Sequence, residues 1–279
     1  MIRLICLFLL LFAVAAHAQE AASPQPAAAS AGAPAQDTGA PPTDAVPQDP
    51  ATLVVAPPAQ APLQPFVADY QVYREGKPVG DATLQVARLD GGRWRVDLGL
   101  RGTRGLARLA ALNIEQSTLF DVADGRYRPL TQATVRRAIF SGKKNTGVYD
   151  WNARTAIWQG DVKKDRRAAI PLQDGDMSAL LINLAIVRDA EPGKHLRYRF
   201  VDDGRVRNHE YAVSTELEKV TVDDLDYNAM RVSRIRSGNE ETILWVSYGV
   251  PTPIRMVQRK DGADVTDLRL IQYNRSQPL

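Results

Sequence analysis

The feature that most constrains this chain is a period-two alternation of apolar and polar residues. In residues 93–101 apolar side chains alternate with charged residues and glycine, and the same pattern returns in residues 196–200 and 267–270. Because successive side chains of a strand point to opposite faces, such runs form strands with one buried and one solvated face. The pattern predicts a mainly β fold.

Turn signals separate these runs. Glycine next to Asp, Asn or Ser supplies the positive φ that tight hairpins require. Roughly a dozen strands joined by such short loops favour an antiparallel meander, since parallel strands need helical crossovers. The signals stand at residues 75–78, 90–92, 124–125, 141–142, 203–204, 237–239 and 261–262.

One segment, residues 176–188, predicts a helix. Asp176 and Ser178 stand where first-turn capping residues are expected, and Glu191-Pro192-Gly193 stops the helix. Its apolar residues lie nearly all round, so it must be covered on most sides. We therefore expect a curved antiparallel sheet, or open half-barrel, that holds one buried apolar α-helix.

The N-terminal region predicts export. Met1–Ala18 combines Arg3, an apolar run from Leu4 to Val14 and small residues at the end, which is typical of a cleavable signal peptide. A membrane anchor is the alternative, but the run has about 11 residues where roughly 20 are needed to cross a bilayer. The signal predicts a periplasmic location.

Residues 19–65 have the composition of an extended linker. They contain 14 Ala and 11 Pro, four acids, and no Lys, Arg or aromatic residue. Such a segment cannot bury enough apolar surface to fold alone, and it serves either as a semi-stiff tether or as a dispensable leader. Residues 66–279 then form a single β-rich domain with 34 basic residues, the chain's 35 less Arg3, against 28 acids, the chain's 32 less four.

Three fragments carry a family resemblance: Tyr70-Gln71-Val72-Tyr73 with the glycines that follow, residues 176–180 before the helix, and Trp245-Val246-Ser247 followed by residues 253–255. Over about residues 66–274 the chain resembles the exported bacterial family known as domain of unknown function 3108. The resemblance implies a periplasmic, largely β protein and brings no activity. The expected architecture is also similar to the half-barrels of lipid carriers such as the LolA group.

The sequence lacks the residues and motifs that several kinds of catalytic and cofactor site require. The predicted mature chain has no cysteine and only His195 and His209, which we assign to surface or strand-pairing positions. No nucleotide-binding glycine loop, metal-ligand spacing or hydrolase serine elbow is present, so we expect no cofactor and no metal. Three acids close together, Asp223, Asp224 and Asp226, leave open a cell-envelope hydrolase that uses turn carboxylates.

The remaining signals favour binding. Clustered arginines and lysines suit anionic headgroups at a membrane surface, and export argues against nucleic acid. Tryptophans are either core residues, which we favour for Trp94 and Trp245, or the lining of a ligand cavity. We predict a non-catalytic periplasmic protein that binds an amphipathic or lipid-like molecule or acts as an envelope accessory factor. The candidate ligand residues are Leu180, Leu184, Trp151, Trp158, Arg101 and Arg104.

Overall fold

The structure is a computed structural model that describes residues 62–109, 111–139, 141–235 and 239–275. The predicted signal peptide and the predicted linker up to Ala61 lie outside the described residues. All described residues belong to one unit, Pro58–Leu279.

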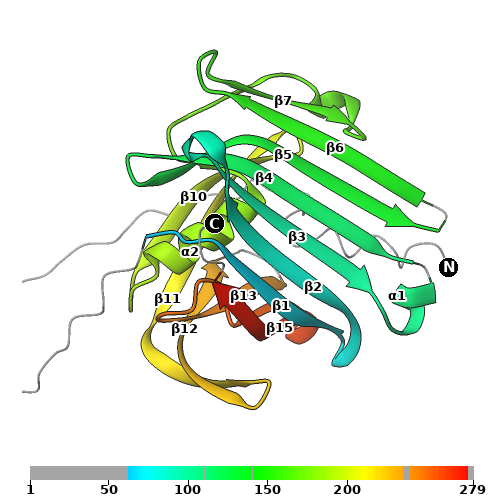
Figure 1. The fold of residues 1–279 in the computed structure, drawn as a ribbon, viewed down its shortest axis with the longest axis vertical. Helices are drawn as coiled ribbons and strands as arrows, with labels where there is room; N and C mark the ends of the chain where they lie inside the picture. The colour runs from blue at the N-terminus through cyan, green and yellow to red at the C-terminus, as the bar shows by residue number, and fades with distance from the viewer. Residues whose placement is uncertain (1–61, 110, 140, 236–238, 276–279) are drawn as a thin grey trace, which may run out of the picture. The chain divides into compact units, whose positions relative to one another are not determined.

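All described strands form one sheet, in the order β8-β7-β6-β5-β4-β3-β2-β1-β15-β14-β13-β12-β11-β10-β9 (Figure 1). Each strand neighbours its predecessor in the chain, except that β9 does not pair with β8, and β1 additionally pairs with β15. Pairing is antiparallel apart from β9 and β10, which are parallel. The strands are β1 (Phe66–Arg74), β2 (Lys77–Arg88), β3 (Trp94–Gly102), β4 (Asn113–Ala123), β5 (Arg126–Ala138), β6 (Ser141–Asp150), β7 (Thr155–Gly160), β8 (Ile170–Pro171), β9 (Asp176–Met177), β10 (His195–Asp202), β11 (Arg205–Val222), β12 (Leu225–Ile235), β13 (Glu240–Ser247), β14 (Arg255–Lys260) and β15 (Ala263–Arg275).

The two edges of the sheet, β8 and β9, are consecutive in the chain but do not pair, so the sheet stays open. β9 instead packs against β5. The Tyr149 hydroxyl on β6 donates to the Val201 carbonyl oxygen on β10 at 2.7 Å, and Gln132 on β5 donates to Asp202. The half from β1 to β8 and the half from β9 to β15 are therefore joined by the β1–β15 ladder at the middle of the sheet and by side-chain hydrogen bonds on its open side.

The helix α2 (Ala179–Asp189) lies beside β10 and contacts β3, β4 and β5 from the other half of the sheet (Figure 1). Its residues Leu181, Ile182, Ala185 and Ile186 are fully buried, because strands from both halves cover it. The prediction of a mainly β fold, an open antiparallel sheet and one buried apolar helix is confirmed.

The predicted capping of this helix is wrong. Asp176 belongs to β9, where its carboxylate accepts hydrogen bonds from Arg199 Nη1 at 2.6 Å and from the Gln173 backbone N–H at 2.8 Å. Ser178 is the N-cap by backbone conformation, but its hydroxyl makes no capping bond and lies 3.0 Å from Thr118 Oγ1. Both side chains connect the helix start to strands, which compete with the helix for their hydrogen bonds.

The core follows the predicted alternation. In β3, Trp94, Val96 and Leu100 are buried while Arg95 and Arg101 are exposed. Trp245 is buried as predicted. Both histidines lie in strands: His195 is exposed, and His209 is buried with its ring centroid 4.7 Å from that of Phe200. A second buried cluster comprises Tyr149, Ala156, Trp158, Val162, Leu172 and Val201.

Candidate ligand-binding site

The antiparallel register brings several strand ends together at one end of the sheet. Phe66, the first residue of β1, pairs with Val86 near the end of β2 and with Arg275 at the end of β15. Arg88 and Trp94 form the last pair between β2 and β3, and Trp94 in turn faces Phe120 near the end of β4. Hairpin ends and the chain segment before β1 therefore converge there.

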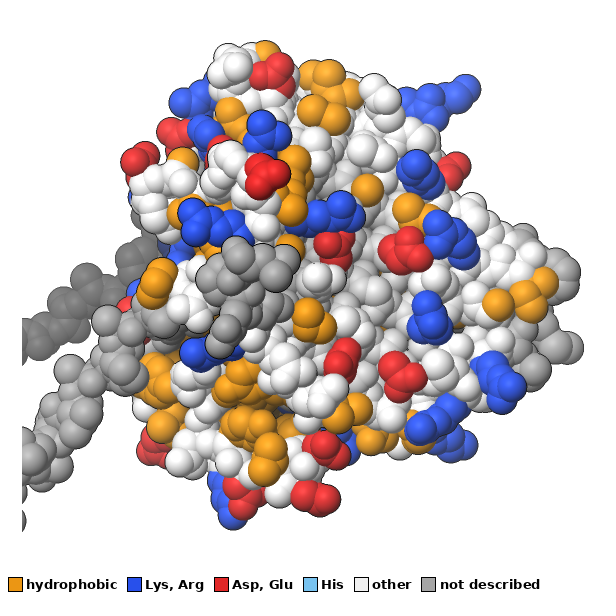
Figure 2. Space-filling model, viewed as in Figure 1, with side chains coloured by type: hydrophobic (Ala, Val, Ile, Leu, Met, Phe, Trp, Pro, Cys, Tyr) orange, Lys and Arg blue, Asp and Glu red, His pale blue; other side chains and the backbone are white. Residues whose placement is uncertain are grey.

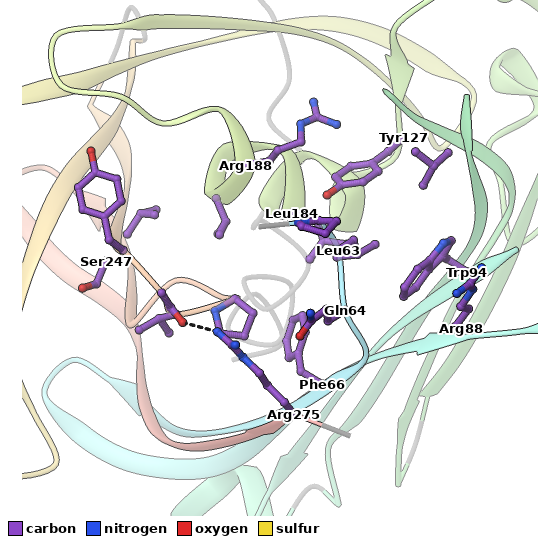
Figure 3. A pocket seen from close by; sticks show the side chains of 18 of the residues that line it. Leu63, Gln64, Phe66, Arg88, Trp94, Tyr127, Leu184, Arg188, Ser247 and Arg275 are labelled. Atoms are coloured by element: carbon purple, nitrogen blue, oxygen red, sulfur yellow. Dashed lines mark hydrogen bonds between the residues drawn. The ribbon is translucent and has the colours of Figure 1, made fainter. Parts of the chain in front are cut away.

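A pocket of about 700 Å³ opens among these ends (Figure 3). Leu184 and Val187 of α2 line one side, and Phe66 and Trp94 line the strand side. A cavity of this size with mostly apolar walls is typical of small-molecule sites. The lining residues are Pro62, Leu63, Gln64, Phe66, Arg88, Trp94, Val122, Gly125, Tyr127, Leu184, Val187, Arg188, Val246, Ser247, Tyr248, Gly249, Val250, Pro251 and Arg275.

Arg188 is held in place by its neighbours. Its guanidinium donates two hydrogen bonds to the Asp189 carboxylate, at 2.6 and 2.9 Å, and one to the Gly125 carbonyl oxygen at 2.9 Å. Its Cζ lies 4.5 Å from the ring centroid of Tyr127, whose pKa is raised by burial. Because Asp189 neutralises it, Arg188 stabilises the pocket wall more than it attracts an anion.

Arg88 and Arg275 carry the uncompensated charge. Arg88 Cζ lies 5.8 Å from the Trp94 ring centroid, and Arg275 donates to the Gly249 carbonyl oxygen at 2.8 Å (Figure 3). Neither forms a salt bridge with a residue in the described ranges, and the lining contains no acid. An apolar cavity with two such cations favours a ligand with an apolar body and an anionic group.

The structure brings few of the sequence-predicted ligand residues together. Leu184 lines the pocket, whereas Leu180 is buried in the same helix away from the lining. Trp158 belongs to the second buried cluster and Trp151 packs against it. The other two, Arg101 and Arg104, lie at the opposite ends of the strands, beside Gly102.

Sequence reasoning missed Arg88, Tyr127 and Arg275. Each lies at or next to the end of a strand, which its sequence neighbours indicate: Arg88 precedes the turn at residues 89–93, and Tyr127 follows the turn at residues 124–125. The alternation marks which face each side chain takes, but not which hairpin ends meet. The only available sequence signal for Arg88 is that a basic residue stands beside a hairpin turn.

The acids of the hydrolase alternative lie in an exposed hairpin tip. Asp223 and Asp224 form the turn between β11 and β12 with φ of 48° and 62°, and Asp226 pairs with Lys219 at 2.7 Å. The lysine and Thr221 hydrogen bonds lower the pKa of Asp226. Local pairing explains Asp226, and the positive φ of the turn, which Asp tolerates, explains Asp223 and Asp224.

Two further features of the described ranges bear on the site. They contain no group of three or more His, Cys, Asp or Glu side chains arranged to hold a metal ion. None of the helices in the same ranges is both long and apolar enough to span a bilayer.

Comparison with known proteins gives the family. The family described as "Protein of unknown function (DUF3108)" matches residues 69–269. The chain belongs to this family. The match includes strands from both halves of the sheet and all of α2, and it confirms the resemblance that the sequence fragments predicted.

Other comparisons add little. A β-barrel-like protein of domain of unknown function DUF1849 from Brucella abortus is 12% identical, with a TM-score of 0.43 over 77% of this chain and 99% of the other. A DUF1089 family protein from Pseudomonas aeruginosa is 13% identical, with a TM-score of 0.34 over 71% and 92%. A search of curated proteins gave no match.

Proposed function

We propose that this member of the family is a non-catalytic binding protein of the bacterial periplasm, and that it holds one amphipathic anionic molecule in the pocket. The apolar part of the ligand lies against Leu184, Val187 and Phe66, and its anionic group lies near Arg88 and Arg275. The observation that carries this proposal is the combination of an apolar cavity of about 700 Å³ with two arginines that no described acid neutralises.

The size and chemistry of the cavity support one ligand molecule. Drug-sized ligands occupy cavities of roughly 300–1,000 Å³ in which a few polar groups fix orientation. Here Arg88 is the polar group best placed to do so, because the Trp94 ring holds its guanidinium at the wall without consuming its hydrogen-bond donors. The periplasmic location rests on the signal-peptide pattern of Met1–Ala18.

No observation favours the hydrolase alternative over binding. Asp223, Asp224 and Asp226 are exposed at a hairpin tip, and a glycosidase needs two carboxylates facing each other across a substrate cleft. A carrier needs no such pair. The binding function therefore stands as the proposal, and hydrolysis of a co-purified molecule would be the finding that reverses it.

The first experiment is native mass spectrometry of the exported protein, followed by extraction and identification of any bound molecule. A stoichiometric amphipathic anion supports the proposal and names the ligand class. A protein that carries nothing is then titrated with a long-chain fatty acid brominated on its chain, because bromine quenches nearby tryptophans. Trp94 is the only tryptophan in the lining set, so quenching that is lost in Trp94→Phe but kept in Trp158→Phe places the chain in this pocket. Absence of both a co-purified ligand and quenching overturns the proposal.

A further inference from the structure

The ends of the strands away from the pocket form a second surface. The short helix α1 (Gly105–Leu109) connects β3 to β4 there and contacts β2, and the turn between β5 and β6 lies at the same end of the sheet. The register shows this directly, since Arg101 pairs with Asn113 and Asn113 pairs with Arg137, one residue from the end of β5. We call this surface the α1 edge, defined by residues 101–108, 137–139 and 143–144.

Two large apolar side chains are exposed on the α1 edge. Leu106 is 76% exposed and Ile139 57% exposed, the two highest values among large hydrophobic residues of the described ranges. α1 is fixed against the sheet: Leu112 N–H donates to the Ala107 carbonyl oxygen at 3.1 Å, and a Cβ added to Gly102 would lie 2.7 Å from the same oxygen. The fold therefore holds Leu106 in water at a rigid position.

Basic residues lie at the same end of the sheet as these two side chains. Figure 2 shows blue Lys and Arg side chains spread over the right-hand part of the face, the part where α1 lies in Figure 1. Three acids stand close by: Glu115 pairs with Arg137 at 2.7 Å, Asp81 accepts from Thr103, and Asp161 accepts from the Lys144 backbone N–H. The exposed basic residues are Arg101, Arg104, Arg108, Arg137, Lys143 and Lys144.

Most of these basic side chains have no salt-bridge partner among the described residues. Apart from Arg137, none of these basic side chains forms a salt bridge with a residue in the part of the chain that the structure describes. Elsewhere on the sheet, arginines pair closely with acids, as Arg128 does with Asp121 at 2.6 Å and Arg255 with Asp267 at 2.9 Å. The α1 edge thus combines unpaired basic side chains with the two most exposed large apolar side chains of the described ranges.

We infer that the α1 edge docks on the surface of an anionic lipid bilayer. Basic residues near such a surface are attracted to its headgroups, and apolar side chains held beside them enter the boundary between headgroups and acyl chains. An acidic polysaccharide would engage the arginines and lysines but would gain nothing from Leu106. Dependence on Leu106 therefore separates a bilayer from a soluble polyanion.

Vesicle sedimentation of the exported protein tests this inference. The probe is vesicles of phosphatidylcholine with or without phosphatidylglycerol. The variant Arg101→Gln/Arg108→Gln should bind the anionic vesicles about thirtyfold more weakly, given roughly fivefold for each basic residue near the surface. The control Arg93→Gln/Arg126→Gln removes the same charge from the other ends of β3 and β5 and should bind as the parent does.

The apolar contribution has its own variant. Leu106→Gln should weaken vesicle binding roughly tenfold, the effect of losing a leucine side chain that is buried in the bilayer boundary. Leu225→Gln, at an exposed leucine of the β11–β12 hairpin, should not weaken it. Equal binding to neutral vesicles, equal losses in the two double variants, or unchanged binding of Leu106→Gln would each overturn the inference. Arg88→Gln should leave vesicle binding intact, so failure of the pocket proposal and failure of this one remain distinguishable.

Discussion

The Arg88 guanidinium lies over the indole ring of Trp94, with Cζ 5.8 Å from the ring centroid, and the two residues are the last cross-strand pair between β2 and β3. Both line the pocket. The contact holds the arginine at the wall while its N–H groups stay available, because a cation on a ring face uses the π-system rather than the hydrogen-bond donors. Arg88 is therefore the residue on which ligand affinity should depend most.

Replacing Arg88 should weaken binding of an anionic amphiphile without unfolding the protein. We expect Arg88→Gln to reduce affinity for a brominated fatty acid about tenfold or more, since hydrogen bonds to charged groups contribute about 1.5–3 kcal/mol. Tryptophan quenching measures the affinity. Arg93→Gln, an exposed arginine in the adjoining turn, is the control, and equal affinities in both variants would exclude Arg88 as the anion contact.

Truncating the centre of α2 should destabilise the domain strongly. Leu181 is fully buried between the two halves of the sheet, so Leu181→Ala should lower the free energy of unfolding by about 2–5 kcal/mol. Leu225→Ala, at a residue 56% exposed, should change it by less than about 0.5 kcal/mol. Urea unfolding followed by tryptophan fluorescence gives both values, and similar midpoints for the two variants would contradict the buried placement of the helix.

Arg199 should matter far more than its neighbour Arg197. Arg199 pairs with Asp176, whose side chain is fully buried, so Arg199→Met leaves a carboxylate buried without its cation and should cost about 3–5 kcal/mol. Arg197 on the same strand is 79% exposed and pairs with Glu210 in solvent, so Arg197→Met should cost less than about 1 kcal/mol. Thermal unfolding of the two variants side by side makes the comparison. A similar loss in both would mean that the Asp176 pair contributes no more than a surface pair.

The pH dependence of stability should contain a contribution from Asp202. Burial raises the pKa of this carboxyl above its ordinary value of 3.8, against the opposing effect of its hydrogen bond from Gln132. Above pH 3.8 the folded state therefore holds the proton more tightly than the unfolded state. The contribution of this carboxyl to stability therefore falls as pH rises from 3.8 to its raised pKa in the folded state.

Asp202→Asn should remove this pH-dependent loss of stability. Relative to the parent, the variant should therefore gain more stability at neutral pH than at acidic pH. Urea midpoints across this range measure the effect. The exposed turn residue Asp90 provides the control, because Asp90→Asn makes the same substitution outside the core. A profile for Asp202→Asn that overlays the parent would show that burial of this carboxyl has no energetic consequence.

Much of the fold was predictable from local patterns. The alternation through Trp94, Val96 and Leu100 predicts β3 and its buried face, because burial of one face is a property of a strand and its neighbours along the chain. The apolar run that forms α2 predicts a covered helix for the same reason. The predicted helix starts at residue 176, three residues before α2. Asp176 belongs to β9 instead, where it binds Arg199, a residue 23 positions away that the local sequence pattern cannot identify.

The candidate site was much less predictable. Leu184 was expected because a buried helix must face whatever cavity the sheet leaves. Arg88, Tyr127 and Arg275 come from separate strands, and only the pairing register of the sheet brings their ends together. Periodicity fixes the face of each strand but not its neighbours, so a site made from hairpin ends stays hidden until the strand order is known.

The single pairing between chain-distant strands has a consequence for how the protein reaches its folded state. Among the described strands, all pairs except β1–β15 join strands that follow each other in the sequence. β1 and β15 come from the two ends of the domain and place Phe66 opposite Arg275. Strands that are neighbours in the sequence pair quickly. Contacts between residues far apart in the sequence slow folding, because the entropy of closing the long intervening loop is lost before the contact contributes stability. Each half of the sheet can therefore form as a local meander. Pairing of β1 with β15 at the middle of the sheet should be the late, rate-limiting step of folding, because it requires both halves to have brought these strands together.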